Sequence, residues 1–320
     1  MPSVSVIITT HDRPHLLVRA IASARVARRR GLEIVVVDDA SRDETEQVCR
    51  SLENIVYVRT ERNQGVAGAR NLGILRSSGD YLNFLDDDDV RLPGSLDAQI
   101  DALDVEPEAG FIYGQAILGK QDGSPTDQLY PSHLPRGDVF WELLTHNFVP
   151  AGTAVFRRSC LYRIGLLDDA VSGVDDWDLW IRLAEMYPVL ALEQPVMVWR
   201  QATPDSGQGS SRAREMVRLS ATQFRERWQE LPRFAASSVT QRRETLRRFS
   251  SAMARHLLWE AWRAVRIGQI RTAQRNLLAA LRQYPTETAG AMVGRAGLRP
   301  VSANNRRSIR AEHILGKVSD

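Results

Sequence analysis

Residues 81–89 decide how this chain folds: they read Tyr81-Leu82-Asn83-Phe84-Leu85-Asp86-Asp87-Asp88-Asp89. The first five are largely apolar, as in a buried strand, and four carboxylates follow without a break. An acidic run is usually a solvated turn, but Val90 and Leu92 on its far side indicate that the chain is buried on both sides of it. Because ligands of open α/β sheets bind beyond the carboxyl ends of the strands, the stretch predicts a strand that ends at a ligand site.

Short β-branched runs alternate with helical patterns through about residue 110. This alternation is typical of βαβ units around a mostly parallel sheet. We expect strands at Val4–Thr9, Glu33–Val37, Ile55–Val58 and Tyr81–Leu85. Pro14 and Pro93 each precede a helical pattern, and Ser41 with Glu44 predicts a capping box for the helix after the second strand.

Beyond Gly110 the pattern is irregular and predicts a mixed sheet. We expect strands at Phe111–Tyr113, Thr153–Phe156, Val189–Leu192 and Val196–Trp199, a polar loop over Gly119–Gly137, a short helix near Phe140–Leu144 and an amphipathic helix at Asp176–Met186. From about Ser210 the strand patterns stop, and two apolar stripes predict a helical hairpin. The stripes are Leu246, Phe249, Met253, Leu257, Ala261 and Val265, then Ile270, Ala273, Leu277 and Leu281.

Composition is that of an ordinary globular protein: of 320 residues, 43% are hydrophobic and 25% charged, which excludes disordered and fibrous classes. There is neither an apolar run of membrane-spanning length nor a signal-peptide pattern, so we expect a cytoplasmic location. Cys49 and Cys160 are far apart and outside any C-x-x-C pattern, which predicts buried structural thiols.

Charge is divided unevenly along the chain. Residues 211–320 hold 22 Lys and Arg against 8 Asp and Glu, a net charge of +14, whereas residues 1–210 carry −11. Such an imbalance indicates cationic partners for the first part and anionic ones for the second. No G-x-G-x-x-G or G-x-x-x-x-G-K pattern cradles a phosphate here, and Arg91 stands where an EF-hand needs glycine. Four adjacent carboxylates repel one another, and we expect a hard divalent cation to reduce this repulsion.

Five ordered motifs resemble those of family 2 glycosyltransferases of the GT-A fold, over about residues 3–200. The motifs are Val4–Thr10, Val37–Ser41, Ala69–Gly73, Phe84–Asp89 and Asp175–Trp180. The resemblance implies an α/β, GT-A-like fold whose mostly parallel sheet continues into a mixed one, and it covers a catalytic domain over 1–208 (nucleotide-binding half 1–110, acceptor-binding half 111–208). The rest of the chain has no comparably specific resemblance. Its apolar stripes and charge predict a C-terminal helical extension over 209–294 and a basic, weakly structured tail over 295–320.

The resemblance also implies sugar transfer from a nucleotide-diphosphate sugar to an acceptor hydroxyl, with inversion. On the nucleotide side, Thr9 and His11 would line the nucleoside, Asp39 would accept a hydrogen bond from the base, Arg70 would contact the phosphates, and Asp87 would lie beside the ribose or sugar. All five residues fall in the motifs or directly after a predicted strand.

A metal and a base complete the implied site. Asp86 and Asp88 would form a D-x-D motif for Mn²⁺ or Mg²⁺, with Asp88 the direct ligand. Asp176 would be the general base, since a sugar hydroxyl is a poor nucleophile, and a helix N-terminus would keep its carboxylate ionised. Helix capping is the alternative role for Asp176. The acceptor or sugar pocket would include Gly152, Thr153, Asp175 and Trp177, whereas Trp180 is expected in the core.

The segment after the last predicted strand departs from the family pattern. Many members carry a histidine there that completes the metal shell, but residues 199–206 contain none. Water or Asp205 would then fill that coordination position, or the aspartates alone would hold the metal. Asp175 stands where glutamate is common, which keeps the carboxylate and shortens it.

Two other functions stay open at this point. A sugar-phosphate nucleotidyltransferase would need a glycine-rich basic loop after the first strand, and residues 10–14 contain no glycine. A non-catalytic nucleotide-sugar or membrane-surface binding protein would not need both Asp88 and Asp176. The expected acceptor is a sugar or lipid-linked glycan used in cell-surface polysaccharide or glycoconjugate synthesis. Binding to an anionic inner membrane face is predicted from the arginines Arg242, Arg243, Arg247, Arg248 and Arg255. A homodimer interface and plain solvated helices are the alternatives, and no nucleic acid partner is expected.

Overall fold

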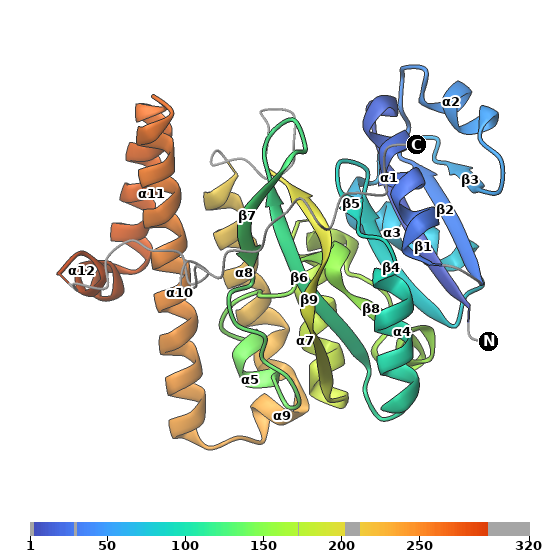
Figure 1. Cartoon of the computed structure of the whole chain (residues 1–320). Coiled ribbons are helices and arrows are strands. Elements are labelled where there is room, and N and C mark those ends of the chain that lie inside the picture. Colours follow the sequence, from blue (N-terminus) through green and yellow to red (C-terminus); the bar gives the residue numbers. More distant parts are fainter. Residues whose placement is uncertain (1–2, 29–30, 172, 202–211, 294–320) are drawn as a thin grey trace. The chain divides into compact units, whose positions relative to one another are not determined.

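The computed structural model describes residues 3–28, 31–171, 173–201 and 212–293. These residues divide into two compact units (Figure 1). The sheet unit comprises residues 3–139 and 148–201, and the helical unit comprises residues 140–147 and 212–293. Residues 140–147, which the predicted boundaries assign to the acceptor-binding half, therefore group with the helices.

A nine-stranded sheet in the order β3-β2-β1-β4-β8-β6-β9-β5 forms the first unit, and β7 pairs with β6 off this path. The first four strands along the chain are parallel neighbours, whereas β8, β7 and β5 run antiparallel to their partners, which confirms a parallel sheet that becomes mixed. The strands are β1 (Val4–Thr10), β2 (Leu32–Asp38), β3 (Val56–Arg59), β4 (Tyr81–Asp86), β5 (Val90–Arg91), β6 (Phe111–Gly119), β7 (Pro125–Tyr130), β8 (Val155–Arg157) and β9 (Val189–Arg200).

Helices cover both faces of this sheet because its central strands are apolar on both sides. Val6 and Ile8 pack in one cluster with apolar residues of α1 and α4, and Ile7, which points the opposite way, meets α3 at Gly73. The helices of the unit are α1 (Pro14–Ala27), α2 (Thr45–Ser51), α3 (Gly65–Arg76), α4 (Ser95–Val105), α6 (Leu161–Ile164) and α7 (Asp175–Met186).

Helix α7 is held by an aromatic cluster. Trp180 is wholly buried, as expected, and its ring lies 5.2 Å from that of Phe111 and 5.7 Å from that of Phe156. Phe84 of β4 lies 5.3 Å from Phe156, so the cluster reaches the central strand. This packing fixes the position of α7 along the sheet and therefore the position of its first turn.

Three local predictions are wrong. The segment Gly119–Gly137 contains strand β7 rather than only a loop, because β6 is longer than its apolar start suggests and provides an edge to pair with. Residues 189–200 form one strand, since register shifts beside Gln115 absorb the Gln194-Pro195 break. The capping box is absent: α2 begins at Thr45, and the Ser41 amide instead donates to Asp38 Oδ1 at 2.8 Å.

The helical unit contains α5 (Phe140–Leu143), α8 (Ala213–Glu226), α9 (Pro232–Ala235), α10 (Val239–Arg266), α11 (Ile270–Gln283) and α12 (Pro285–Val293). The predicted hairpin is α10 and α11, which pack along each other. Phe224 and Phe249, with ring centroids 4.7 Å apart, lie at the centre of its aromatic core. The predicted stripe of α10 is buried in its middle, whereas Leu246 and Val265 at its ends are 40% and 53% exposed.

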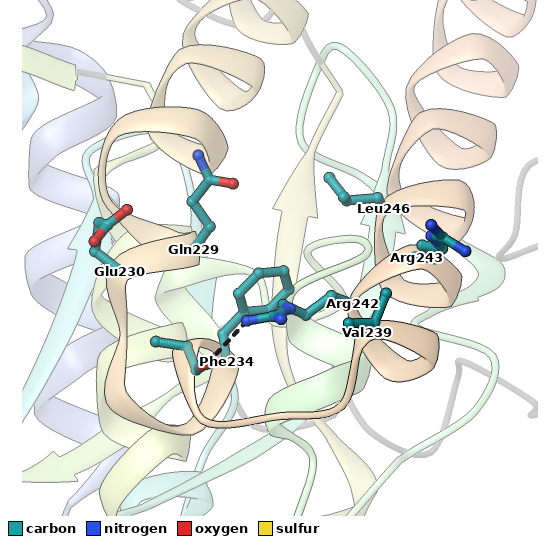
Figure 2. Close-up of a pocket in the computed structure, with 8 residues that line it drawn as sticks. Gln229, Glu230, Phe234, Val239, Arg242, Arg243 and Leu246 are labelled. Atoms are coloured by element: carbon teal, nitrogen blue, oxygen red, sulfur yellow. Dashed lines mark hydrogen bonds between the residues drawn. The ribbon is translucent and has the colours of Figure 1, made fainter.

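A cavity of about 460 Å³ lies beside the start of α10 (Figure 2). It is lined by Gln229, Glu230, Phe234, Ala235, Val239, Arg242, Arg243 and Leu246. The predicted tail over 295–320 lies outside the described residues. Among the residues that the structure does describe, no helix combines the length and the apolar character that crossing a membrane requires.

Candidate active site

The carboxyl ends of β1, β2 and β4 bring polar residues from distant parts of the sequence to one edge of the sheet. Thr9 of β1 is in register with Asp86 of β4 and with Val37 of β2. One residue further on, Thr10 Oγ1 donates to Asp87 Oδ2 at 2.7 Å. The acidic run is therefore attached to β1 by a buried hydrogen bond as well as by strand pairing.

The two residues predicted to meet a nucleobase lie at this edge. His11 Nδ1 is 2.8 Å from the Asp39 carbonyl oxygen, and the imidazole is partly exposed. The buried Asp39 carboxylate accepts hydrogen bonds from the amides of Gln64 and Gly65 at 2.8 and 2.9 Å, so it caps the start of α3. Thr60 also donates to Asp39 Oδ1, so Oδ2 accepts only the Gly65 amide and has capacity for a donor from a base.

The four carboxylates of the acidic run have different surroundings. Asp86 and Asp88 are partly exposed, whereas Asp87 and Asp89 are buried. Arg13 from the loop after β1 lies 3.3 Å from both Asp87 Oδ1 and Asp88 Oδ2. Asp89 Oδ1 accepts the backbone amide of Arg200 at 2.9 Å, which ties the run to the end of β9.

Negative charge at this edge exceeds what nearby cations neutralise. Burial raises the pKa of Asp87 to about 7, against the opposing effect of Arg13. Burial and the Asp86 charge raise the pKa of Asp88, and burial with the Asp88 charge raises the pKa of Asp89 well above its usual range. The carboxylates thus disfavour one another's ionisation, as expected for a site that binds a cation.

The donor set fits a divalent metal that shares its shell with a ligand. Within the described ranges, no three His, Cys, Asp or Glu side chains are grouped so as to hold a metal ion by themselves. Asp86 and Asp88, the two partly exposed carboxylates, each provide oxygen ligands of the type that Mg²⁺ and Mn²⁺ prefer. Mg²⁺ is commonly held by one or two carboxylates together with substrate phosphates and water, and this edge offers the protein's part of such a shell.

Arg70 connects this run to the predicted base helix. Its guanidinium is buried, with Nη2 2.8 Å from Asp86 Oδ1 and Nη1 3.0 Å from Asp175 Oδ2. It also lies over the Phe84 ring at 5.1 Å. Arg70 was expected to contact phosphate, but in this structure two of its nitrogens are used by carboxylates that lie 89 positions apart in the sequence.

Asp176 lies in the first turn of α7, beside this bridge. Its Oδ1 accepts the Trp177 amide at 2.7 Å, and its side chain is partly exposed. Burial and the Asp175 charge raise the pKa of Asp176 to about 7, although Arg70 lowers it. Burial and the neighbouring Asp175 carboxylate thus oppose the ionised form that a helix N-terminus favours.

The predicted acceptor-pocket residues are mostly buried. Thr153 has no exposed surface and its hydroxyl donates to the Pro150 carbonyl at 2.8 Å. Asp175 is 1% exposed and Trp177 is 5% exposed, so both contribute more to the floor of the site than to its surface. Gly152 belongs to a short 3₁₀ turn, Ala151–Thr153, and a Cβ there would lie 2.8 Å from Met197 Sδ.

Buried polar side chains that the sequence did not single out support this turn. Asn83 and Arg91 both donate to the Gly152 carbonyl, at 3.2 and 2.7 Å, and Gln99 donates to the Thr153 carbonyl at 2.8 Å. Burial lowers the pKa of Arg91 to about 9. A polar residue inside an apolar strand, such as Asn83 within Tyr81–Leu85, was the available signal for this role.

Sequence reasoning missed the roles of two further residues. Thr10 hydrogen-bonds the acidic run and Arg13 forms an ion pair with Asp88, although neither was among the predicted site residues. Their positions after the first strand were the signal, but which one reaches β4 depends on the sheet register. In the segment that lacks the family's histidine, Arg200 donates through its Nε to the Gln121 carbonyl, and Asp205 lies outside the described residues.

Known structures share this fold. A mannosyltransferase from Pyrobaculum calidifontis, solved with GDP-Man and Mn²⁺, superposes with a TM-score of 0.57 at 20% identity, covering 91% of this chain and 78% of that one. TarS of S. aureus, solved with UDP-GlcNAc, gives 0.54 at 15% identity, covering 88% and 92%. These similarities confirm the GT-A-like class, with additional C-terminal helices.

Sequence comparisons identify the family. An uncharacterized glycosyltransferase of Rickettsia prowazekii is 29% identical over 57% of this chain and 58% of its own length. The Campylobacter jejuni GalNAc(5)-diNAcBac-PP-undecaprenol beta-1,3-glucosyltransferase is 41% identical over 38% of this chain and 40% of its own. Matches to four Rickettsia relatives span 32% to 60% of their lengths. The model of glycosyl transferase family 2 matches residues 5–165, half of the chain, so this protein belongs to glycosyl transferase family 2.

Proposed function

We propose that this chain transfers a sugar from a nucleoside-diphosphate sugar to an acceptor hydroxyl, with inversion at the anomeric carbon. The observation that carries the proposal is the Arg70 bridge, which holds the acidic run of β4 and the first turn of α7 in one site. Sugar transfer requires metal-binding carboxylates at the donor diphosphate and a proton-accepting carboxylate at the acceptor hydroxyl, and the two groups must lie close together.

On the donor side, Asp86 and Asp88 would hold Mn²⁺ or Mg²⁺ against the diphosphate. The ion supplies neutralisation of the charge that builds up on the departing diphosphate. His11 would line the nucleoside and Asp39 would accept a hydrogen bond from the base, while Thr9 would line the nucleoside and Asp87 would lie beside the ribose or sugar; the His11–Asp39 contact and the pairing of Thr9 with Asp86 support these roles. Arg13 adds a positive charge beside Asp88.

On the acceptor side, Asp176 would accept the proton of the attacking hydroxyl. A base is most effective when its pKa lies near the working pH, and the pKa of Asp176 is about 7. A single displacement assisted in this way inverts the anomeric centre. The acceptor that we propose is a lipid-linked glycan used in cell-surface polysaccharide or glycoconjugate synthesis, since such an acceptor appears in the name of the C. jejuni relative.

The test is a donor panel. Purified protein would be incubated with UDP- and GDP-sugars, with Mn²⁺, with Mg²⁺ or with EDTA, and donor hydrolysis scored. We expect one donor to be hydrolysed in the presence of metal. In titration calorimetry Asp88→Ala should lose the metal-dependent part of donor-nucleotide affinity, while Asp101→Ala, an exposed carboxylate of α4, should not. Equal affinity with and without metal in the wild type would remove the metal role.

The same panel separates the other functions. A nucleotidyltransferase would consume a nucleoside triphosphate and a sugar phosphate and release pyrophosphate. A binding protein would bind a nucleotide sugar and leave it intact. Either result would contradict the proposal.

A further inference from the structure

The turn between α10 and α11 presents aliphatic side chains to solvent. Val265, Ile267 and Ile270 are 53%, 62% and 51% exposed, and every residue from Val265 to Arg271 is exposed. Scattered single apolar side chains on a surface are ordinary, but a cluster of large ones marks an interaction site. We call this cluster the hairpin tip and define it as Trp262, Val265, Arg266, Ile267, Ile270 and Arg271.

Only positive charge surrounds these aliphatic groups on their own segment. The sequence contains five arginines and no Asp or Glu between Ala261 and Gln283. Glu260, just before this segment, is buried and paired with Arg263 at 2.8 Å. Arg266 and Arg271 at the tip have no acidic partner within the described parts of the chain. The tip is therefore apolar and cationic at once.

An aromatic side chain completes the tip. The Trp262 ring stacks on that of Trp259 with centroids 4.7 Å apart, and Arg266 lies over Trp262 at 4.9 Å. A tryptophan held beside an arginine at the margin of an aliphatic cluster is typical of side chains at a bilayer interface, where one part of the ring is apolar and the other meets water.

We infer that the hairpin tip binds the surface of an anionic lipid bilayer, with the aliphatic side chains entering the headgroup region and Arg266 and Arg271 meeting phosphates. A second copy placed tip to tip would bring the same arginines together with no acid from this segment to pair them. Nucleic acid would satisfy the arginines but would leave the three aliphatic groups without a partner. An anionic bilayer satisfies both kinds of group.

This location differs from the one expected from the arginines of early α10. Arg247 and Arg248 both pair with Glu244, at 2.8 and 2.7 Å. The nearby cavity also contains Glu230, and Arg242 in it donates to the Ala235 carbonyl (Figure 2). Charge at that end is mixed, whereas the tip is uniformly positive. The inference goes beyond the proposed reaction and does not depend on it.

The test uses the full chain and two kinds of vesicle, one of phosphatidylcholine alone and one with a third of phosphatidylglycerol. In flotation at low salt we expect binding to the anionic vesicles only, and loss of binding as salt shortens the screening length. Arg266→Gln with Arg271→Gln should weaken partitioning about 25-fold, at about fivefold for each basic residue. The matched control, Arg247→Gln with Arg248→Gln, removes two paired arginines and should weaken it far less.

Insertion is measured separately from attraction. An environment-sensitive fluorophore on Ile267→Cys should shift to the blue with anionic vesicles, while the same label on Leu75→Cys, an exposed apolar position of the sheet unit, should not. Both native cysteines are buried, so labelling is directed to the new thiol. Three results would each overturn the inference. They are equal binding to both vesicles, an unshifted Ile267→Cys label, and sedimentation showing that the double glutamine variant loses self-association instead. Donor hydrolysis without vesicles should be unchanged in every tip variant.

Discussion

At the scale of single residues, the chemistry of the site depends on the protonation state of Asp176. Burial and Asp175 oppose its ionisation and Arg70 favours it, and the balance leaves the pKa of Asp176 at about 7. A base must be deprotonated to act, so transfer should rise with pH and level off above about 7. The measurement is the pH dependence of kcat for transfer at saturating donor and acceptor.

Replacing Asp176 tests the same assignment by mutation. Asp176→Asn should keep donor affinity and reduce kcat for transfer by about 10²–10⁴-fold, the usual contribution of a general base. Asp169→Asn, an exposed carboxylate shortly before α7, is the control and should transfer at the wild-type rate. If the Asn variant at position 176 turned over acceptor normally, the residue would be only a helix cap.

Arg70 acts through the carboxylates it touches, which makes it a positioning residue. Arg70→Met removes the positive charge that lowers the pKa of Asp176, so the acidic limb of the kcat profile should move to higher pH. Arg70→Lys keeps the charge and should restore the limb in part, without bridging both Asp86 and Asp175. A phosphate contact would behave differently: donor affinity would fall while the pH profile stayed in place.

At the scale of elements, the position of Arg70 depends on how closely α3 approaches β1. A Cβ on Gly73 would lie 2.3 Å from Ile7 Cγ2, a distance that real contacts do not reach. Because Ile7 is wholly buried, the helix would have to move away from the strand. Packing therefore requires glycine at position 73. Arg70 lies three positions earlier on the same helix, so its position depends on this contact.

Gly73→Ala should destabilise the protein by about 1–3 kcal/mol, the usual cost of overpacking a core, and should lower transfer because Arg70 moves with α3. Gly290→Ala is the matched control, since nothing lies within 4 Å of a Cβ at that helical position. Thermal unfolding and kcat would be measured for both variants. Wild-type behaviour of the first would show that α3 tolerates the shift and does not position Arg70.

At the scale of the whole molecule, the strand order concentrates acid at one edge of the sheet, and this makes stability depend on pH. The pKa of the buried Asp87 is about 7 in the fold, against 3.8 for the unconstrained group. Between these values the unfolded chain has released a proton that the folded chain retains, so rising pH favours unfolding. The effect reaches about 4 kcal/mol for a shift of this size.

The expected result is a melting temperature in EDTA that falls from pH 5 to pH 8. Mn²⁺ should raise it more at pH 8 than at pH 5, because the ion binds ionised carboxylates. Differential scanning fluorimetry at fixed ionic strength is the measurement, with EDTA and Mn²⁺ series side by side. A melting temperature that rose with pH in EDTA would contradict the raised pKa values.

The sequence by itself determined the βαβ order, the four parallel strands, the acidic run at a strand end and the family resemblance. These follow from local periodicity and from motifs of adjacent residues, which need no knowledge of distant contacts. It also determined the hairpin of α10 and α11, since the stripe spacing of 246–265 and 270–281 is a local property.

Only the tertiary structure decided what these side chains do. Whether Thr9 or Thr10 reaches Asp87 depends on the register of β1 against β4, and a shift of one residue exchanges the two faces. The Arg70 bridge joins residues 16 and 105 positions away, which no local pattern encodes. Likewise β7 and the single strand β9 exist because β6 provides edges to pair with. Burial sets the pKa values of Asp87 and Asp176, and burial is a property of the packed chain.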